Sequence, residues 1–425
     1  MLRFLILFLI IIFPLKVFAM PDAENFEENK FRLACALTSL AAYGNDESFL
    51  MRAMLNSRGW KIEGIQNKNS RADAKAYLIS KTENNHTTKI LVITGTEDLK
   101  DVEVDFRFGR VPLKNTETAD DIENKIFVHR GFRDYTDNVL SGGVAEYLID
   151  DLKKNPNETL YLTGHSLGGA VATLVAIRLC DMGIDTNRMK VITFGAPAVG
   201  NKKLAQAYEN KIDLVRVEMN GDPIKKSLAV LGYVHFGESL KYKKIEVDNL
   251  SPHSIAIYLD NAIRNYYDTG GFNEVPKVDS KYKNKIPVYV APIKIVDKSF
   301  KKDDEKYIEA IVRDHFLASF EHVTFAEKIF MTVDEADNFS FSVQGYINEA
   351  KKFGCKFIIV QMLRSEVMKE SERRTQRIIL EEIIYDLKGN PLTMQNTGMT
   401  TEKLSILEAV QASEEYLQDD RRKIF

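Results

Sequence analysis

The sequence has few of the residues that mark disulfide-rich or metal-binding proteins. Its 425 residues include only three cysteines, Cys35, Cys180 and Cys355, and none of them has the short spacing of a metal site. Three cysteines are too few for a disulfide framework. One bridge, between Cys35 and Cys180, is allowed, but we expect buried free thiols. The chain therefore needs an ordinary hydrophobic core for its stability.

The chain also lacks an excess of either charge. It has 58 Lys and Arg against 61 Asp and Glu, a formal net charge of -3. Proteins that bind nucleic acid carry a clustered basic excess, so this composition excludes nucleic acid as a partner. With 44% hydrophobic residues, the chain is long enough for two domains with ordinary cores.

Long apolar runs are rare, and the one at the N-terminus predicts export. The run covers residues 2–13, contains the basic Arg3 and is broken by Pro14 and Lys16 before the small residue Ala19. This is the pattern of a signal peptide. A membrane-spanning helix needs about 18 to 20 apolar residues, and this run is shorter. We expect cleavage near Ala19 and a periplasmic or secreted protein; an uncleaved membrane anchor is the alternative.

The main motif of the sequence is a serine flanked by glycines. Gly164, Ser166 and Gly168 fit the pattern G-x-S-x-G, which forms a sharp turn with the serine hydroxyl exposed above a sheet. Side chains at the two glycines would clash in so tight a turn. An apolar run at 160–163 predicts the preceding strand and residues 169–179 predict the following helix. This context favours a nucleophile elbow over a chance loop.

Strands and helices alternate around this motif. A helix is expected at 24–43 and a hairpin at 74–93, and the later segments predict further strands at 190–194 and 214–219, with helices at 133–154 and 202–210. Such alternation implies an α/β fold with a mostly parallel sheet. Ligands of these sheets bind at the carboxyl ends of the strands.

The alternation of predicted strands and helices ends near residue 270, where we place a domain boundary. We expect a signal peptide at 1–19, an α/β domain with the serine motif at 24–270, a linker at 271–286 and a second, smaller α/β domain at 287–425. The last domain is expected to hold strands at 288–296, 356–361 and 377–385, and helices at 304–320, 342–353 and 401–418.

A nucleophilic serine needs a general base, and two histidines are candidates. His235 alternates with apolar residues as on a strand, where a structural histidine is the default. His253 follows Ser251 and Pro252, a helix-start signal. A histidine at a loop-to-helix junction can reach into a cleft, so we favour His253.

The acid that orients the base and the donors for an oxyanion have candidates as well. Asp222, in the loop after a predicted strand, is favoured over Asp248, although either can be a turn-forming aspartate. An acyl-transfer site needs two backbone N–H groups. The candidates are Leu167, directly after the serine, and Thr96, in the loop after a predicted strand.

Several of these motifs together resemble the class 3 lipases, a fungal-lipase-like family of α/β hydrolases. The resemblance covers about residues 34–266, and its motifs lie at 92–96, 128–132, 163–170, 193–201, 220–223 and at His253 with Tyr258 behind it. It implies a catalytic triad of Ser166, Asp222 and His253, an oxyanion hole from Thr96 and Leu167, and His235 as a structural residue.

The resemblance also implies an activity. It implies hydrolysis of lipid esters, by a lipase, phospholipase or esterase, without metal or cofactor and with transient contact to a lipid surface. The family usually carries a partly apolar segment with a tryptophan after the oxyanion loop. Residues 97–105 are acidic and lack tryptophan, so the sequence does not predict activation at a lipid surface.

Two other functional classes remain. One is a catalytically silent scaffold or binding protein that acts through its C-terminal domain, which can dock a protein partner. The other keeps the serine but changes the chemistry, as in an acyltransferase, thioesterase or peptidase. The ordered presence of serine, aspartate and histidine argues against the scaffold.

Overall fold

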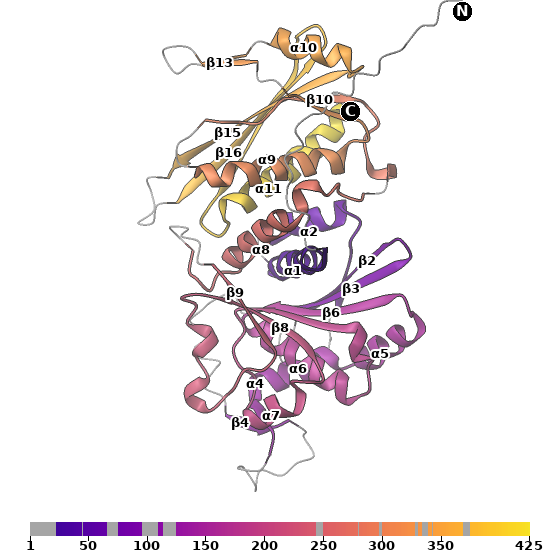
Figure 1. The fold of residues 1–425 in the computed structure, drawn as a ribbon, viewed down its shortest axis with the longest axis vertical. Coiled ribbons are helices and arrows are strands. Elements are labelled where there is room, and N and C mark those ends of the chain that lie inside the picture. Colours follow the sequence, from indigo (N-terminus) through magenta and orange to yellow (C-terminus); the bar gives the residue numbers. More distant parts are fainter. Residues whose placement is uncertain are drawn as a thin grey trace, which may run out of the picture.

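The structure, a computed structural model, describes residues 23–44, 46–65, 75–95, 109–113, 125–243, 250–278, 280–296, 300–327, 330–333, 339–341, 343–368 and 375–425. The predicted signal peptide at 1–19 and the acidic segment at 97–105 lie outside these residues. Two sheets stand one above the other in Figure 1, with a layer of helices between them.

The first sheet has seven strands in the order β1-β2-β3-β6-β7-β8-β9. The first three strands pair antiparallel, and β3 to β9 pair parallel, as the alternation of strands and helices predicts. The strands are β1 (Lys61–Ile65), β2 (Ala76–Glu83), β3 (His86–Ile93), β6 (Glu158–His165), β7 (Met189–Phe194), β8 (Asp213–Met219) and β9 (Glu238–Tyr242). A separate pair is formed by β4 (Arg110–Pro112) and β5 (Phe127–His129).

Helices cover both faces of this sheet, because its strands are apolar on both sides. Along β3, Ile90 and Val92 face one core cluster, and Leu91 and Ile93 face the other. The first face carries α1 (Ala23–Ala41), α2 (Asp46–Ser57) and α8 (Ile255–Thr269), and the second carries α4 (Arg130–Leu140), α5 (Val144–Lys154), α6 (Leu167–Asp181) and α7 (Lys202–Tyr208). Short 3-10 turns lie at η1 (Thr186–Arg188), η2 (Ile224–Lys226), η3 (Ala229–Leu231), η4 (Gly271–Asn273) and η5 (Ser280–Tyr282).

The second sheet runs in the order β12-β10-β15-β16-β17, with β11 beside β15. Helices α9 and α11 pack on one face and α10 on the other. Its elements are β10 (Val288–Val290), β11 (Lys294–Ile295), α9 (Lys302–Ser319), β12 (Val323–Phe325), α10 (Val343–Lys352), β15 (Phe357–Val367), β16 (Gln376–Asp386), β17 (Pro391–Thr400) and α11 (Ile406–Ile424). A small hairpin is formed by β13 (Met331–Val333) and β14 (Phe339–Phe341).

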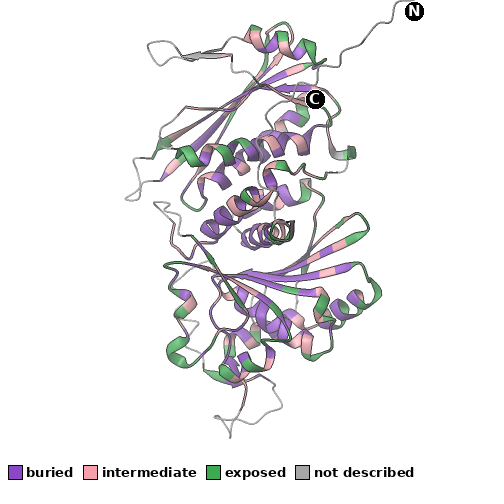
Figure 2. Cartoon of the chain, viewed as in Figure 1, coloured by how far each residue is buried: buried purple, intermediate pink, exposed green. Residues whose placement is uncertain are grey.

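The hydrophobic core continues from one part of the chain into the other. One cluster of buried side chains includes Met51 of α2 and Tyr267 of α8 together with Ile311 of α9 and Val410 of α11. Figure 2 shows the corresponding buried surfaces of these helices facing one another between the sheets. The predicted boundary near residue 270 therefore separates two sheets that share a core.

Several element predictions need correction. The strand expected at 288–296 is split into β10 and β11, because Pro292 between them has no N–H group for a sheet ladder. The helix expected at 401–418 begins later, because 391–400 form β17 and Ser405 makes a capping box with Glu408. Helix α2 was not predicted. All three cysteines are free thiols; Cys35 and Cys355 are buried, as expected, whereas Cys180 is half-buried. Burial raises the pKa of the Cys35 thiol to about 12.

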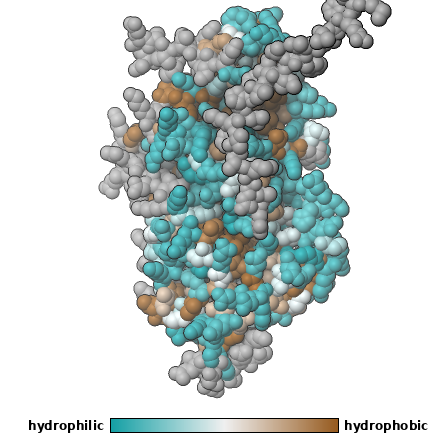
Figure 3. All heavy atoms as spheres, viewed as in Figure 1, coloured by the Kyte–Doolittle hydropathy of each residue, from teal (hydrophilic) through white to brown (hydrophobic). Residues whose placement is uncertain are grey.

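The face of the molecule seen in Figure 3 is mostly hydrophilic, with hydrophobic side chains scattered over both the upper and the lower part. In the described part of the chain, every helix is too short or too polar to cross a membrane.

Candidate active site

Ser166 lies in a strained turn between β6 and α6. Its backbone has φ 56° and ψ -124°, a left-handed conformation that non-glycine residues rarely adopt. The Ser166 N–H donates to the carbonyl of Phe194, the last residue of β7, at 2.9 Å. This is the strand, turn and helix geometry of a nucleophile elbow.

The glycines around the serine are required by close backbone contacts. A Cβ atom at Gly164 would collide with the backbone of Gly168, and one at Gly168 would collide with the carbonyl of Ile93 in β3. Rigid backbone atoms on both sides leave no room for a side chain. The elbow is thus wedged between its own helix and the end of the neighbouring strand.

A histidine and an aspartate reach Ser166 from elsewhere in the chain. His253 Nε2 is 2.8 Å from Ser166 Oγ, and His253 Nδ1 is 2.8 Å from Asp222 Oδ2. Asp222 follows the carboxyl end of β8, and His253 precedes α8. Because the Nδ1–H donates to the carboxylate, Nε2 is left to accept the serine proton.

Asp222 is held by further hydrogen bonds. Tyr258 Oη donates to Oδ2 at 2.6 Å, and the Ile224 N–H donates to Oδ1 at 2.8 Å. Burial opposes ionisation, but the bonds from His253, Tyr258 and Ile224 outweigh it and lower the pKa of Asp222. The carboxylate is therefore ionised and fixed toward the histidine.

Gly195 allows the aspartate and the histidine to meet. Its φ is +58°, and a Cβ atom there would lie 2.8 Å from Asp222 Oδ2 and 3.1 Å from His253 Nδ1. A side chain at this position would push into the hydrogen bond between the two residues. Gly195 falls within the motif at 193–201, but the sequence analysis did not assign it to the site.

His165 and Tyr43 form a second pair of side chains that holds the backbone of His253. His165 Nε2 donates to the backbone carbonyl of His253 at 2.7 Å, so its Nδ1 accepts from Tyr43 Oη, also at 2.7 Å. Burial, and then the nearby His253, lower the pKa of His165 to about 3, which keeps it neutral. The sequence analysis assigned neither His165 nor Tyr43 to the site, and no motif marks Tyr43.

The remaining candidates fall in three groups. His235 Nε2 donates to the Lys225 carbonyl at 2.9 Å and lies outside the hydrogen-bonded chain of the site; the structure has no strand at His235, contrary to the sequence pattern. Asp248 and Thr96 lie outside the described residues. Leu167 is the first residue of α6, and N–H groups in a first turn have no intrahelical acceptor.

The loop that leads to Thr96 passes directly beside the elbow. A Cβ atom at Gly95 would lie 2.5 Å from the carbonyl of His165, so the chain after β3 and the start of α6 are neighbours. In the described residues, no group of three or more His, Cys, Asp or Glu side chains is arranged to hold a metal ion.

Comparisons with known proteins agree on one family. A family model described as lipase (class 3) matches residues 90–231. A lipase of Caenorhabditis elegans is 43% identical over 70 residues, which are 16% of this chain and 20% of that protein. The secreted mono- and diacylglycerol lipase A of Penicillium cyclopium is 38% identical over 97 residues, 22% of this chain and 31% of the relative.

The aligned stretches are short on both sides. The chain spans only 20% and 31% of the length of these two relatives. A solved structure of the triacylglyceride lipase of Rhizomucor miehei is 21% identical, with a TM-score of 0.41 over 52% of this chain and 80% of that chain. The match at 90–231 contains the elbow and Asp222, so the part of the chain that carries the candidate site is similar to the class 3 lipases.

Proposed function

We propose that the protein hydrolyses carboxylic esters of lipids through a covalent acyl-enzyme. The observation that carries this proposal is the continuous chain of hydrogen bonds from Ser166 Oγ through His253 to Asp222. A serine becomes a nucleophile when an oriented base can take its proton. The class 3 lipase match supports a lipid ester as the substrate class.

The geometry supports a two-step reaction. Ser166 Oγ attacks the ester carbonyl carbon while His253 Nε2 takes the hydroxyl proton. The protonated imidazole, held by ionised Asp222, then gives this proton to the leaving alcohol. In the second step water attacks the acyl carbon and passes a proton to Nε2. The bond from this carbon to Ser166 Oγ then breaks, Nε2 returns the proton to Oγ, and the fatty acid leaves.

Two backbone N–H groups complete the site in this proposal. The N–H of Leu167 lies in the first turn of α6, where the helix dipole favours negative charge. The second donor is Thr96, which directly follows Gly95 beside the elbow. Both would stabilise the negative charge on the carbonyl oxygen in the transition state.

The test is labelling of the serine, followed by an activity measurement. We expect an active-site-directed fluorophosphonate to add once to the purified protein and not to Ser166→Ala, as measured by intact mass. Hydrolysis of a short-chain ester should fall by about a thousandfold or more in Ser166→Ala. No adduct on the folded native protein, or a loss of less than tenfold, would support a silent scaffold.

The substrate and the location are also proposals. One relative is named a secreted mono- and diacylglycerol lipase and another a phospholipase A1, which supports acylglycerols or phospholipids as substrates and export as the route. Incubation with an ester, water and a primary alcohol separates hydrolysis from acyl transfer, because transfer yields the new ester. We expect free fatty acid as the main product.

A further inference from the structure

A cavity lies at the end of the first sheet that is opposite to Ser166. It has a volume of about 480 Å³, within the range of about 300 to 1,000 Å³ that is typical of small-molecule sites. His86, at the start of β3, lines it, whereas Ile93, at the end of the same strand, touches the elbow. Seven residues of extended strand, at about 3.3 Å each, separate the two by roughly 23 Å.

The cavity is formed where the two parts of the chain meet. Helices α1 and α2 and the β2–β3 hairpin supply one side, and α9 and α11 supply residues on the other. Figure 1 shows α1 and α2 between the first sheet and these two helices. A ligand in this cavity would contact both parts of the protein.

Part of the cavity wall is apolar, and a volume of about 480 Å³ can hold a hydrocarbon chain. Aliphatic and aromatic side chains from α1, α2, α8 and α9 and from the loop before β1 line it, among them Phe31, Leu37, Met54, Trp60, Tyr266 and Ile311. Sites of this kind bind through the apolar wall and fix orientation with a few polar groups. The wall therefore fits an acyl chain.

The polar residues around the cavity carry both charges in equal number. They comprise the basic Lys30, Arg58, Lys81 and Lys277 and the acidic Glu27, Glu83, Glu274 and Asp314. A head group with a single charge would meet as many repulsive as attractive partners. A head group that carries one charge of each sign can place both favourably.

Two of the cations are available for a phosphate. Lys30 Nζ lies 3.7 Å from Glu274, and Arg58 Nη1 lies 3.8 Å from Glu415. Both distances exceed hydrogen-bond length. A phosphate oxygen can therefore accept from Lys30 without replacing a hydrogen bond to Glu274. Arg58 Nη1 already donates to the Met54 carbonyl at 3.3 Å, so Arg58 would offer its other N–H groups.

We propose that this cavity binds a single-chain phospholipid with a zwitterionic head, its acyl chain against the apolar part of the wall and its head among the mixed charges. The choice of ligand rests on the proposed function, because hydrolysis of one ester of a phospholipid yields such a molecule. The site is separate from the catalytic serine, so binding here does not require catalysis.

Trp60 provides a direct readout, because it is the only tryptophan in the chain and it lines the cavity. The experiment titrates Ser166→Ala, which cannot turn over the ligand, with myristoyl-lysophosphatidylethanolamine below its micelle concentration. Myristate and monomyristin serve as the anionic and neutral arms. We expect a saturable change in Trp60 emission, with the zwitterionic lipid binding at least threefold more tightly than the other two.

Two variants locate the ligand. Ala34→Phe fills the cavity from α1 and should remove the saturable change, with circular dichroism and the urea midpoint as folding controls. Lys30→Met should weaken binding of the zwitterionic lipid by about threefold to fivefold, the value of a partly exposed charge pair. Lys154→Met, on the exposed end of α5 away from the cavity, should leave binding unchanged.

Three results would overturn the proposal. They are the absence of a saturable change, a change that persists in folded Ala34→Phe, and binding of myristate or monomyristin as tight as that of the zwitterionic lipid. Fluorophosphonate labelling of native Ser166 is measured separately. A failed labelling test with intact binding would count against the proposed function alone.

Discussion

Tyr258 of α8 holds the Asp222 carboxylate in position through a hydrogen bond from its hydroxyl. Its hydroxyl donates to Asp222 and accepts from the Met219 N–H at 3.1 Å. We expect Tyr258→Phe to lower kcat about tenfold with little change in KM, since a hydrogen bond to a charged group contributes about 1.5 kcal/mol or more. Steady-state kinetics on a soluble ester measure both constants.

The pH profile separates positioning from a general loss of structure. Without this donor the pKa of Asp222 rises, so the acidic limb of the kcat profile should move to higher pH. Tyr416→Phe, at an exposed tyrosine on α11, is the matched control. An unchanged profile with lower activity would assign Tyr258 to packing alone.

His165 makes the stability of the fold depend on pH. Burial lowers its pKa from 6.5 to about 3, so between these values the unfolded chain binds the proton and the folded chain does not. Stability therefore falls as the pH falls through this window. At about 1.4 kcal/mol per pH unit, His165 accounts for about 3 kcal/mol of the loss between pH 7 and pH 4.5.

The measurement is urea unfolding at both pH values. His165→Gln removes the titrating group, so we expect its stability to change less between pH 7 and pH 4.5 than that of the native protein. His86→Gln, at an exposed histidine of the β2–β3 hairpin, should keep the native slope. Equal slopes in all three proteins would contradict the assignment.

At the scale of elements, the contact between α6 and the end of β3 decides whether the elbow can form. Gly168→Ala would place a methyl group against the Ile93 carbonyl. We expect a loss of about 2 kcal/mol or more, since overpacked sites cost about 1 to 3 kcal/mol, together with loss of fluorophosphonate labelling. Differential scanning calorimetry and intact mass measure the two effects.

Gly44 supplies the control for this element. An added Cβ at Gly44 would meet nothing within 4 Å, so Gly44→Ala should keep both the stability and the labelling. If Gly168→Ala were as stable and as reactive as Gly44→Ala, the elbow would be more open than the contacts indicate.

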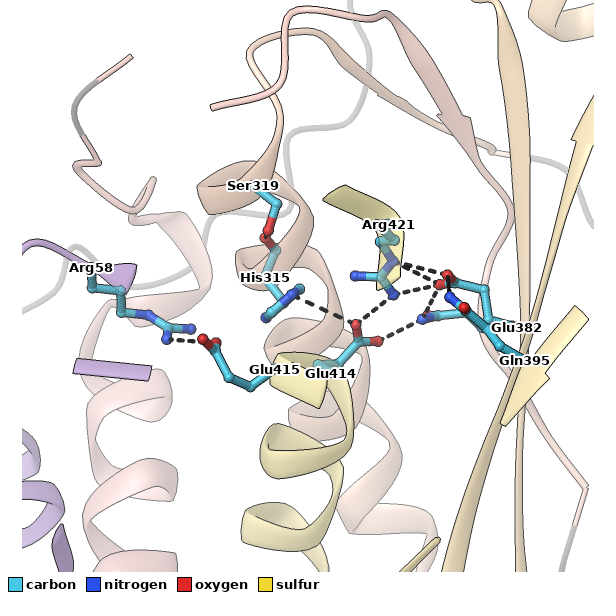
Figure 4. A network of polar contacts seen from close by, with 9 residues as sticks. Arg58, His315, Ser319, Glu382, Gln395, Glu414, Glu415 and Arg421 are labelled. Carbon is cyan, nitrogen blue, oxygen red and sulfur yellow. Dashed lines mark hydrogen bonds and ion pairs between the residues drawn. The ribbon is translucent and has the colours of Figure 1, made fainter. Parts of the chain in front are cut away.

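At the scale of the whole molecule, a buried ionic network holds the second sheet to its helices. Arg421 of α11 is 2% exposed and forms ion pairs with Glu382 of β16 and Glu414. Figure 4 shows this network beside His315 of α9, with the pair of Arg58 and Glu415 next to it. Arg58 directly follows α2, which packs on the first sheet, whereas Glu415 lies on α11, which packs on the second sheet. The contact between them therefore lies where the two sheets and their helices meet.

Loss of the central cation should be costly. Arg421→Met leaves the buried carboxylates of Glu382 and Glu414 without a cation, and we expect about 3 to 5 kcal/mol of destabilisation in urea unfolding. Arg422→Met, at the exposed neighbour, should change stability by less than about 0.5 kcal/mol. Glu382→Gln should recover part of the loss in the Arg421→Met background, and no recovery would contradict the ionic origin.

Local patterns predicted much of the first sheet. The hairpin at 74–93 appears as β2 and β3, with Asn84 and Asn85 both at positive φ in its turn, because asparagine tolerates this conformation. The split of the helix at 133–154 appears as α4 and α5, separated by glycines with positive φ. The late start of α11 was missed, because β17 extends to Thr400 through its pairing with β16, which a local pattern does not show. The capping box of Ser405 and Glu408 is a local signal that could have located the start of the helix.

The sequence by itself determined the elbow and the alternation of strands and helices, because these depend on steric rules and periodicities within a few residues. Only the tertiary structure decided which histidine and which acid face Ser166, that Gly195 must leave room for their contact, and that His165 and Tyr43 support His253. It also decided that the two sheets share a core with a cavity at the junction. These features depend on distances between residues far apart in the chain, which no local pattern encodes.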